Sequence, residues 1–96
     1  MNEIDLAKKV IQFEEGYRSK PYYCTEGYPT IGWGEVIGKK GSPLPNIEWT
    51  ERQAMEALDK KLVIAVSELT KNKATKDFYP KLSDDRQAIL ISMWYQ

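Results

Sequence analysis

The sequence predicts an α+β fold in one small domain, and two observations carry this prediction. Two stretches, one near the N-terminus and one after residue 50, have apolar residues at helical spacing. The segment between them is rich in aromatic and β-branched residues and is interrupted by glycine-containing turns, which is typical of short strands. We therefore expect a helix, a small β lobe over about 16–49, a connecting helix over about 50–70, and the start of a helical lobe over 71–96. The 96 residues suffice for a single domain.

The first helix is expected over residues 3–15. Asn2 stands where an N-cap residue is favoured, and Gly16 stands where helices commonly end. The apolar positions at helical spacing are Ile4, Ala7, Val10 and Ile11. Glu15 therefore falls in the last turn, where the negative end of the helix dipole opposes ionisation of its carboxyl group and favours the protonated acid.

Three short strands are expected in the middle of the chain. Residues 18–23 read as extended, with Pro21 suited to an edge or to a strand start. Residues 28–33 form a second strand, and Gly27 lies in the turn before it. Residues 35–37 supply a third. The following segment, up to residue 45, is rich in glycine, proline and lysine and reads as a loop.

A long amphipathic helix is expected next. Thr50 and Gln53 form a capping-box pattern at its start. The apolar stripe of this helix consists of Ala54, Leu58, Leu62, Ala65, Val66 and Leu69. A polar connector over 71–76 follows, and then an apolar anchor around Pro80 formed by Phe78, Tyr79 and Leu82.

Ser83 is placed to cap a last helix that is apolar on nearly every side over residues 88–95. Such a helix is normally buried all round. The sequence stops at Gln96 with no further element to cover it. Either partners bury this helix or the chain is a piece of something longer, and we favour the second explanation. The 96-residue chain alone is expected to self-associate or to be unstable.

The composition excludes several classes of function. Lys plus Arg equals Asp plus Glu, 14 against 14, so no charge excess favours nucleic acid or an anionic membrane. The absence of histidine excludes Ser-His and Cys-His catalysis and histidine metal sites. Cys24 is the single cysteine, so no intramolecular disulfide forms. No apolar stretch is long enough to insert into a membrane. We expect no metal and no cofactor.

Three residues with different chemistry lie in one continuous run: Glu15, Cys24 and Thr30. Glycoside hydrolysis needs an acid for the leaving oxygen and, in inverting enzymes, a base for water. Glu15 suits the first role, whereas Cys24 suits a thiolate base or a water-positioning group. Each also has an ordinary explanation: a solvated helix-end carboxylate, a small buried thiol and a common strand residue. Two glycines, Gly32 and Gly34, indicate either a close backbone approach, as at the floor of a cleft, or simple bends.

The same run resembles the phage T4-type lysozymes, glycoside hydrolase family 24, which have the lysozyme-like fold. The shared pattern is Glu15, eight residues, Cys24, five residues and Thr30. The flanking residues 25–28 and 30–34, the long capped helix and the last segment are also similar to this family. The resemblance implies a muramidase that cuts the β-1,4 bond between N-acetylmuramic acid and N-acetylglucosamine in peptidoglycan glycan strands.

The resemblance also implies roles for individual residues. Glu15 would be the general acid, Cys24 would replace the usual aspartate and assist water, and Thr30 would help to hold that water. Val36 and Tyr95 match positions that line the substrate cleft between the two lobes. Relatives commonly have histidine at the position of Glu35, so a local ionic contact differs here.

The family pattern leaves two functions and one expected location. The first function is a phage-type lysozyme, either an endolysin or a tail-associated enzyme. The second is a catalytically silent peptidoglycan-binding or tail-assembly module, suggested by the thiol in place of a carboxylate and by the uncovered last helix. The polar, acidic N-terminus is unlike a signal peptide. We therefore expect accumulation in the host cytoplasm and action on the cell wall after release.

The family chain continues past the segment matched by Gln96, so the helical lobe is expected to be incomplete.

Overall fold

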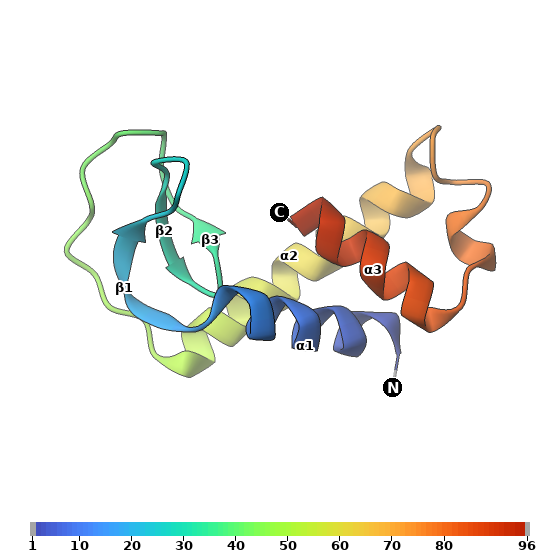
Figure 1. Ribbon diagram of the computed structural model, residues 1–96, viewed down its shortest axis with the longest axis horizontal. Helices are drawn as coiled ribbons and strands as arrows, with labels where there is room; N and C mark the ends of the chain where they lie inside the picture. Colours follow the sequence, from blue (N-terminus) through green and yellow to red (C-terminus); the bar gives the residue numbers. More distant parts are fainter. Residues whose placement is uncertain (1, 96) are drawn as a thin grey trace. The chain divides into compact units, whose positions relative to one another are not determined.

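The computed structural model describes residues 2–95 and confirms the α+β fold (Figure 1). Along the described chain the elements are α1 (Glu3–Glu15), β1 (Arg18–Tyr23), β2 (Pro29–Gly32), β3 (Glu35–Val36), α2 (Glu51–Lys71), the 3-10 helix η1 (Tyr79–Lys81) and α3 (Asp84–Tyr95). The bounds of α1 and β1 are those predicted, whereas β2 and β3 are each shorter than expected. The difference arises because only residues 29–32 and 35–36 pair with a neighbouring strand.

Local side-chain hydrogen bonds fix where the helices begin. The backbone N–H of Asp5 donates to Asn2 Oδ1 at 2.9 Å, which confirms the predicted N-cap of α1. The capping box of α2 is reciprocal: Gln53 N–H donates to Thr50 Oγ1 at 3.1 Å, and Thr50 N–H donates to Gln53 Oε1 at 2.8 Å. The register of α2 along the chain is therefore set by its own first turn.

The three strands form an antiparallel sheet in the order β1-β2-β3. Tyr22 of β1 is paired with Thr30 of β2, and Thr30 is paired with Val36 of β3. Directly opposed residues in such a sheet have their side chains on the same face. Tyr22, Thr30 and Val36 therefore form one row across one face, with one residue from each strand. Ile31, the next residue of β2, points to the other face and is fully buried.

The chain divides into two compact units. One unit, here termed the hairpin unit, comprises residues 12–58. The other, the helical unit, comprises the residues up to 11 and those from 59 onward. Helices α1 and α2 are each divided between the units, so each helix contributes one segment to the hairpin unit and another to the helical unit.

The hairpin unit is built around a small core and several backbone-anchored aromatic residues. Gly32 lets the strand approach α2, because a side chain there would meet Ala54 Cβ at 3.2 Å and the Trp49 ring at 3.3 Å. The rings of Tyr17 and Trp33 pack with centroids 5.4 Å apart. The Tyr17 hydroxyl donates to the backbone oxygen of Trp49 at 2.7 Å. The buried apolar residues of this unit are Pro29, Ile31, Trp33, Ala54 and Leu58.

The helical unit is held mainly by apolar contacts. Its buried apolar residues come from α1, α2, η1 and α3 and are Ala7, Ile11, Leu62, Ala65, Leu69, Tyr79, Ala88 and Ile91. An ion pair joins α1 to α2 in this unit, Lys8 Nζ to Asp59 Oδ1 at 2.6 Å. Within the predicted apolar anchor, Tyr79 is buried but Phe78 is 45% exposed, so Phe78 does not belong to the core.

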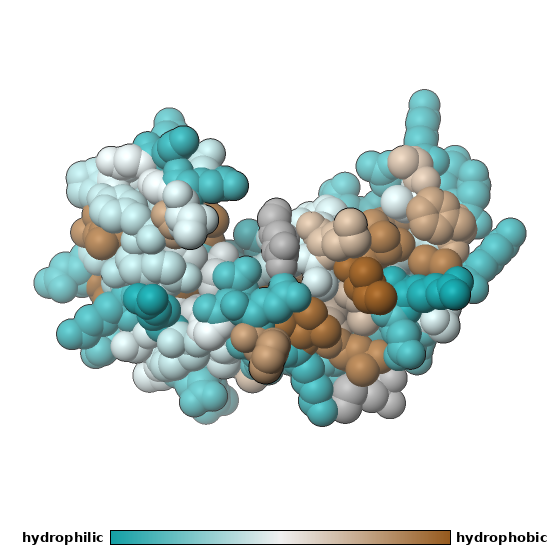
Figure 2. Space-filling model, viewed as in Figure 1, coloured by the Kyte–Doolittle hydropathy of each residue, from teal (hydrophilic) through white to brown (hydrophobic). Residues whose placement is uncertain are grey.

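Helix α3 is buried on one face only among the described residues. Ala88, Ile91 and Ser92 are buried, whereas Ile89 and Met93 are 57% and 66% exposed. Figure 2 shows apolar residues at the surface of the helical unit. Self-association through this apolar helix stays a prediction. Within residues 2–95 no helix combines the length and apolarity that crossing a bilayer requires.

Candidate active site

The Glu15 carboxyl group lies against the backbone of the turn that joins β2 to β3. Glu15 is the last residue of α1 and is half-buried. A Cβ atom added at Gly34 would lie 3.0 Å from both Cδ and Oε2 of Glu15. Gly34 also has a φ of +82°, which a residue with a side chain adopts only at a cost. The predicted close backbone approach is therefore present at Gly34, and the group it approaches is the candidate acid.

Cys24 begins the turn that joins β1 to β2, and the residue is half-buried. The turn is closed by Gly27 N–H donating to the Cys24 carbonyl oxygen at 2.9 Å. The pKa of the thiol is lowered, chiefly by a backbone hydrogen bond from Tyr28, with desolvation opposing the shift. Further hydrogen bonds come from the backbone of Glu26 and Gly27 and from the Thr30 side chain. This turn favours the thiolate, which is the form that can accept a proton.

Thr30 is 2% exposed and occupies the centre of the sheet. Its hydroxyl donates to the Tyr28 carbonyl oxygen at 2.8 Å and is also within hydrogen-bonding reach of the Cys24 sulfur. The hydroxyl is thus held by a backbone group and faces the thiol. Two of the three residues predicted from the sequence, Cys24 and Thr30, therefore influence one another, because the Thr30 side chain helps to lower the pKa of the thiol.

Tyr22 is a residue that sequence reasoning missed. Its pKa is raised, first by desolvation and then by the charge of Glu15, while Arg18 lowers it and Cys24 also raises it. The Tyr22 hydroxyl is therefore within electrostatic reach of both Glu15 and Cys24. The guanidinium group of Arg18 lies over the Tyr22 ring, 4.5 Å from its centroid. Pairing with Thr30 across the sheet is the signal that distinguishes Tyr22 from the other tyrosines, and register is not readable from sequence alone.

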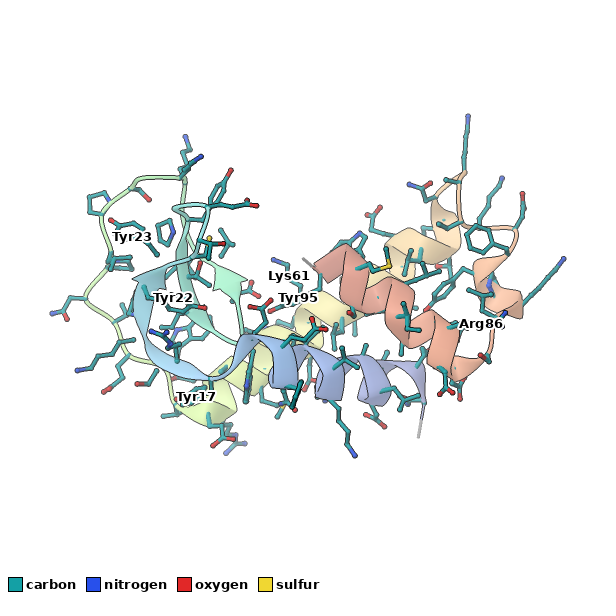
Figure 3. The ribbon with its side chains drawn as sticks, in the orientation of Figure 1. Tyr17, Tyr22, Tyr23, Lys61, Arg86 and Tyr95 are labelled. Atoms are coloured by element: carbon teal, nitrogen blue, oxygen red, sulfur yellow. The ribbon has the colours of Figure 1, made fainter. Side chains whose placement is uncertain are left out.

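The two predicted substrate-binding residues belong to different units. Val36 lies in the same sheet row as Thr30 and is 44% exposed. Tyr95 is on α3 in the helical unit, where Lys61 Nζ lies 5.8 Å from the centroid of its ring (Figure 3). Their contact with a glycan stays a prediction. Among residues 2–95 no group of three or more His, Cys, Asp or Glu side chains is arranged to hold a metal ion.

Comparison with known families places these residues in context. The sequence profile of the phage lysozyme family matches residues 12–96, and the match includes Glu15, Cys24, Thr30, Val36 and Tyr95. The chain belongs to the phage lysozyme family. A comparison with curated proteins gives no match.

Membership of the phage lysozyme family has general consequences for function. The family is one of lysozyme-like glycosidases, so membership indicates a lysozyme-like, peptidoglycan-degrading role in this broad sense. The α+β arrangement of three helices and a small antiparallel sheet within residues 2–95 agrees with a lysozyme-like fold. The narrower assignment to the T4-type group, and a continuation beyond Gln96, stay predictions.

Proposed function

We propose that this phage lysozyme family member is a muramidase that hydrolyses the β-1,4 bond between N-acetylmuramic acid and N-acetylglucosamine in the bacterial cell wall. The observation that carries the proposal is one neighbourhood in the hairpin unit. Within it, a carboxyl group lies against a glycine backbone, and the pKa of a thiol is lowered in part by a buried hydroxyl. The Tyr22 hydroxyl is within electrostatic reach of the first two groups.

In the proposed reaction Glu15 is the general acid. It donates its proton to the glycosidic oxygen while the bond between that oxygen and the anomeric carbon breaks, and the bonding electron pair goes to the oxygen. Half-burial at the end of α1, against the Gly34 backbone, holds the carboxyl group in one place. Fixed placement of the acid is what makes such a proton transfer efficient.

Cys24 and Thr30 handle the water in this proposal. The water oxygen bonds to the anomeric carbon, and its proton passes to the Cys24 thiolate, which becomes a thiol. The lowered pKa of Cys24 makes the thiolate accessible nearer to neutral pH than for an ordinary cysteine. The Thr30 hydroxyl orients the same water. Exchange of protons with solvent then restores the Glu15 acid and the Cys24 thiolate.

One observation favours a second function, a catalytically silent module that binds peptidoglycan or serves in phage-tail assembly. Cys24 stands where the family pattern usually has a carboxylate. An un-ionised thiol is a weaker proton acceptor than a carboxylate, so it is less able to take a proton from water. The same hairpin unit would then recognise glycan strands without cleaving them.

The substitution Glu15→Gln separates the two functions. The amide keeps the shape of the side chain but has no acidic proton, so we expect glycan cleavage to fall by at least about a thousandfold. The measurement is release of reducing-end fragments from purified peptidoglycan, identified by mass spectrometry. Glu14→Gln is the matched control, because it changes the neighbouring carboxyl group on an exposed position of the same helical turn.

Unchanged cleavage by the Glu15→Gln variant would remove Glu15 as the acid. Peptidoglycan binding without fragments from either the wild-type or the variant protein would instead establish the silent module. Cleavage by the wild-type protein that is lost only in Glu15→Gln supports the muramidase.

A further inference from the structure

Three tyrosines of the hairpin unit are labelled in Figure 3, and their hydroxyl groups have different hydrogen-bond partners. The Tyr17 hydroxyl donates to the Trp49 backbone oxygen at 2.7 Å, and the Tyr23 hydroxyl donates to the Ser42 backbone oxygen at 2.8 Å. Both anchor the segment between β3 and α2, Tyr23 from within β1 and Tyr17 from the position just before it. No acceptor for the Tyr22 hydroxyl is found among residues 2–95, so its proton is free for another atom.

The position of Tyr22 in the sheet directs it toward the candidate site. Tyr22 is paired with Thr30, so both side chains lie on the same face. Tyr23, the next residue, is paired with Pro29 and lies on the opposite face. Strand β1 therefore places Tyr22 in the row that contains Thr30, whereas Tyr23 anchors a loop from the other face.

The charged neighbours of Tyr22 keep it a hydrogen-bond donor. Three ionisable groups act on its hydroxyl: Glu15, Arg18 and Cys24. Desolvation and the two acidic groups raise the pKa of the phenol, so it stays protonated at neutral pH. The Arg18 guanidinium, 4.5 Å from the ring centroid, holds the ring by a cation–π contact. A protonated hydroxyl on a fixed ring is a directed donor.

We propose that Tyr22 is a further site residue, whose hydroxyl donates a hydrogen bond to the water held by Cys24 and Thr30. This inference rests on the proposed muramidase function for the role of that water. The water oxygen accepts this hydrogen bond, so one of its lone pairs is held toward Tyr22. In this orientation one hydrogen of the water points at the sulfur of the Cys24 thiolate. Loss of the Tyr22 hydroxyl therefore affects both cleavage and ionisation of the thiol.

The test is Tyr22→Phe, with Tyr23→Phe as the matched control on the adjacent residue. Phenylalanine keeps the ring over which Arg18 packs and removes only the hydroxyl. We expect kcat for peptidoglycan cleavage to fall about tenfold to a hundredfold, with KM changed less than about threefold. A second measurement is the rate of Cys24 alkylation by iodoacetamide as a function of pH. Its midpoint should move to higher pH in Tyr22→Phe and stay in place in Tyr23→Phe.

The two measurements distinguish failure of this inference from failure of the proposed function. An unchanged alkylation midpoint in Tyr22→Phe overturns the inference whether or not the protein cleaves glycan. An unchanged kcat in an active enzyme also overturns it. If the wild-type protein cleaves nothing, the muramidase proposal fails, and the alkylation midpoint alone then decides whether Tyr22 donates to the water at Cys24. Far-ultraviolet circular dichroism checks that each variant is folded.

Discussion

The hairpin unit and the helical unit stabilise their residues by different means. In the hairpin unit, functional groups are fixed by backbone hydrogen bonds, as at Cys24, Thr30 and the Tyr17 hydroxyl. In the helical unit, buried apolar side chains from α1, α2, η1 and α3 supply most of the contacts. Stability and chemistry are thus concentrated in different parts of the chain. Substitutions in the core of the helical unit should therefore lower stability without changing the chemistry, and substitutions of site residues in the hairpin unit should do the reverse.

The largest effect on stability is expected from Leu62→Ala. Leu62 is fully buried on α2 in the helical unit, so the substitution removes apolar contacts and leaves a cavity. We expect a loss of about 2–5 kcal/mol in the free energy of unfolding. Urea denaturation measures it, with Val63→Ala, 60% exposed, as a control expected within about 0.5 kcal/mol. Reduced cleavage per folded molecule in Leu62→Ala would contradict the separation of stability from chemistry.

Gly34→Ala should have a smaller effect on stability but should reduce activity. A Cβ at Gly34 would meet the Glu15 carboxyl group at 3.0 Å and would displace the candidate acid by a few tenths of an ångström. The positive φ adds about 1–2 kcal/mol of destabilisation, and the displaced acid should lower kcat about tenfold or more.

The control for this substitution is Gly41→Ala. Gly41 has a similar φ of +79°, but no atom lies within 4 Å of its added Cβ. The φ values are thus matched, whereas the contact with Glu15 is present at Gly34 and absent at Gly41. Equal activity of the two variants would show that the Gly34 contact does not position the acid.

The smallest effect is a pH dependence of stability carried by Cys24. The thiol has a pKa below its ordinary value of 9.0 in the folded protein, so the unfolded chain binds more protons between the two pKa values. Stability from this group therefore rises with pH through that window and is lost as pH falls through the folded-state pKa. Urea denaturation from pH 6 to pH 9.5 should show the difference between wild type and Cys24→Ser growing with pH. A constant difference would mean that the turn does not favour the thiolate.

The parts of the fold set by local sequence were predictable. The Asn2 cap and the Thr50–Gln53 capping box each depend on residues only three positions apart, and both form as expected. The turn at Gly27 is equally local. The prediction that β2 extends over 28–33 was too long, because strand ends depend on pairing with a neighbour and not on propensity alone.

The site was predictable only in part. The spacing of Glu15, Cys24 and Thr30 identified a candidate, since a helix end, a turn and a return strand bring such residues near one another. The contact of Gly34 with Glu15 and the position of Tyr22 depend on tertiary approach and on strand register. Tyr17, Tyr22 and Tyr23 lie close together in the sequence, yet only the structure shows which of these three hydroxyl groups is left without a backbone acceptor among residues 2–95.

The Thr30 hydroxyl lies within reach of two hydrogen-bond acceptors, and this affects how easily Cys24 can change its charge. A hydroxyl carries one hydrogen, and here two acceptors compete for it, the Tyr28 carbonyl oxygen and the sulfur. When the thiol ionises, rotation about one side-chain bond of Thr30 redirects that hydrogen to the sulfur. The carbonyl is not orphaned by this swing, because the Cys24 N–H continues to donate to it at 3.0 Å. The backbone can therefore stay still while a negative charge appears and disappears beside it.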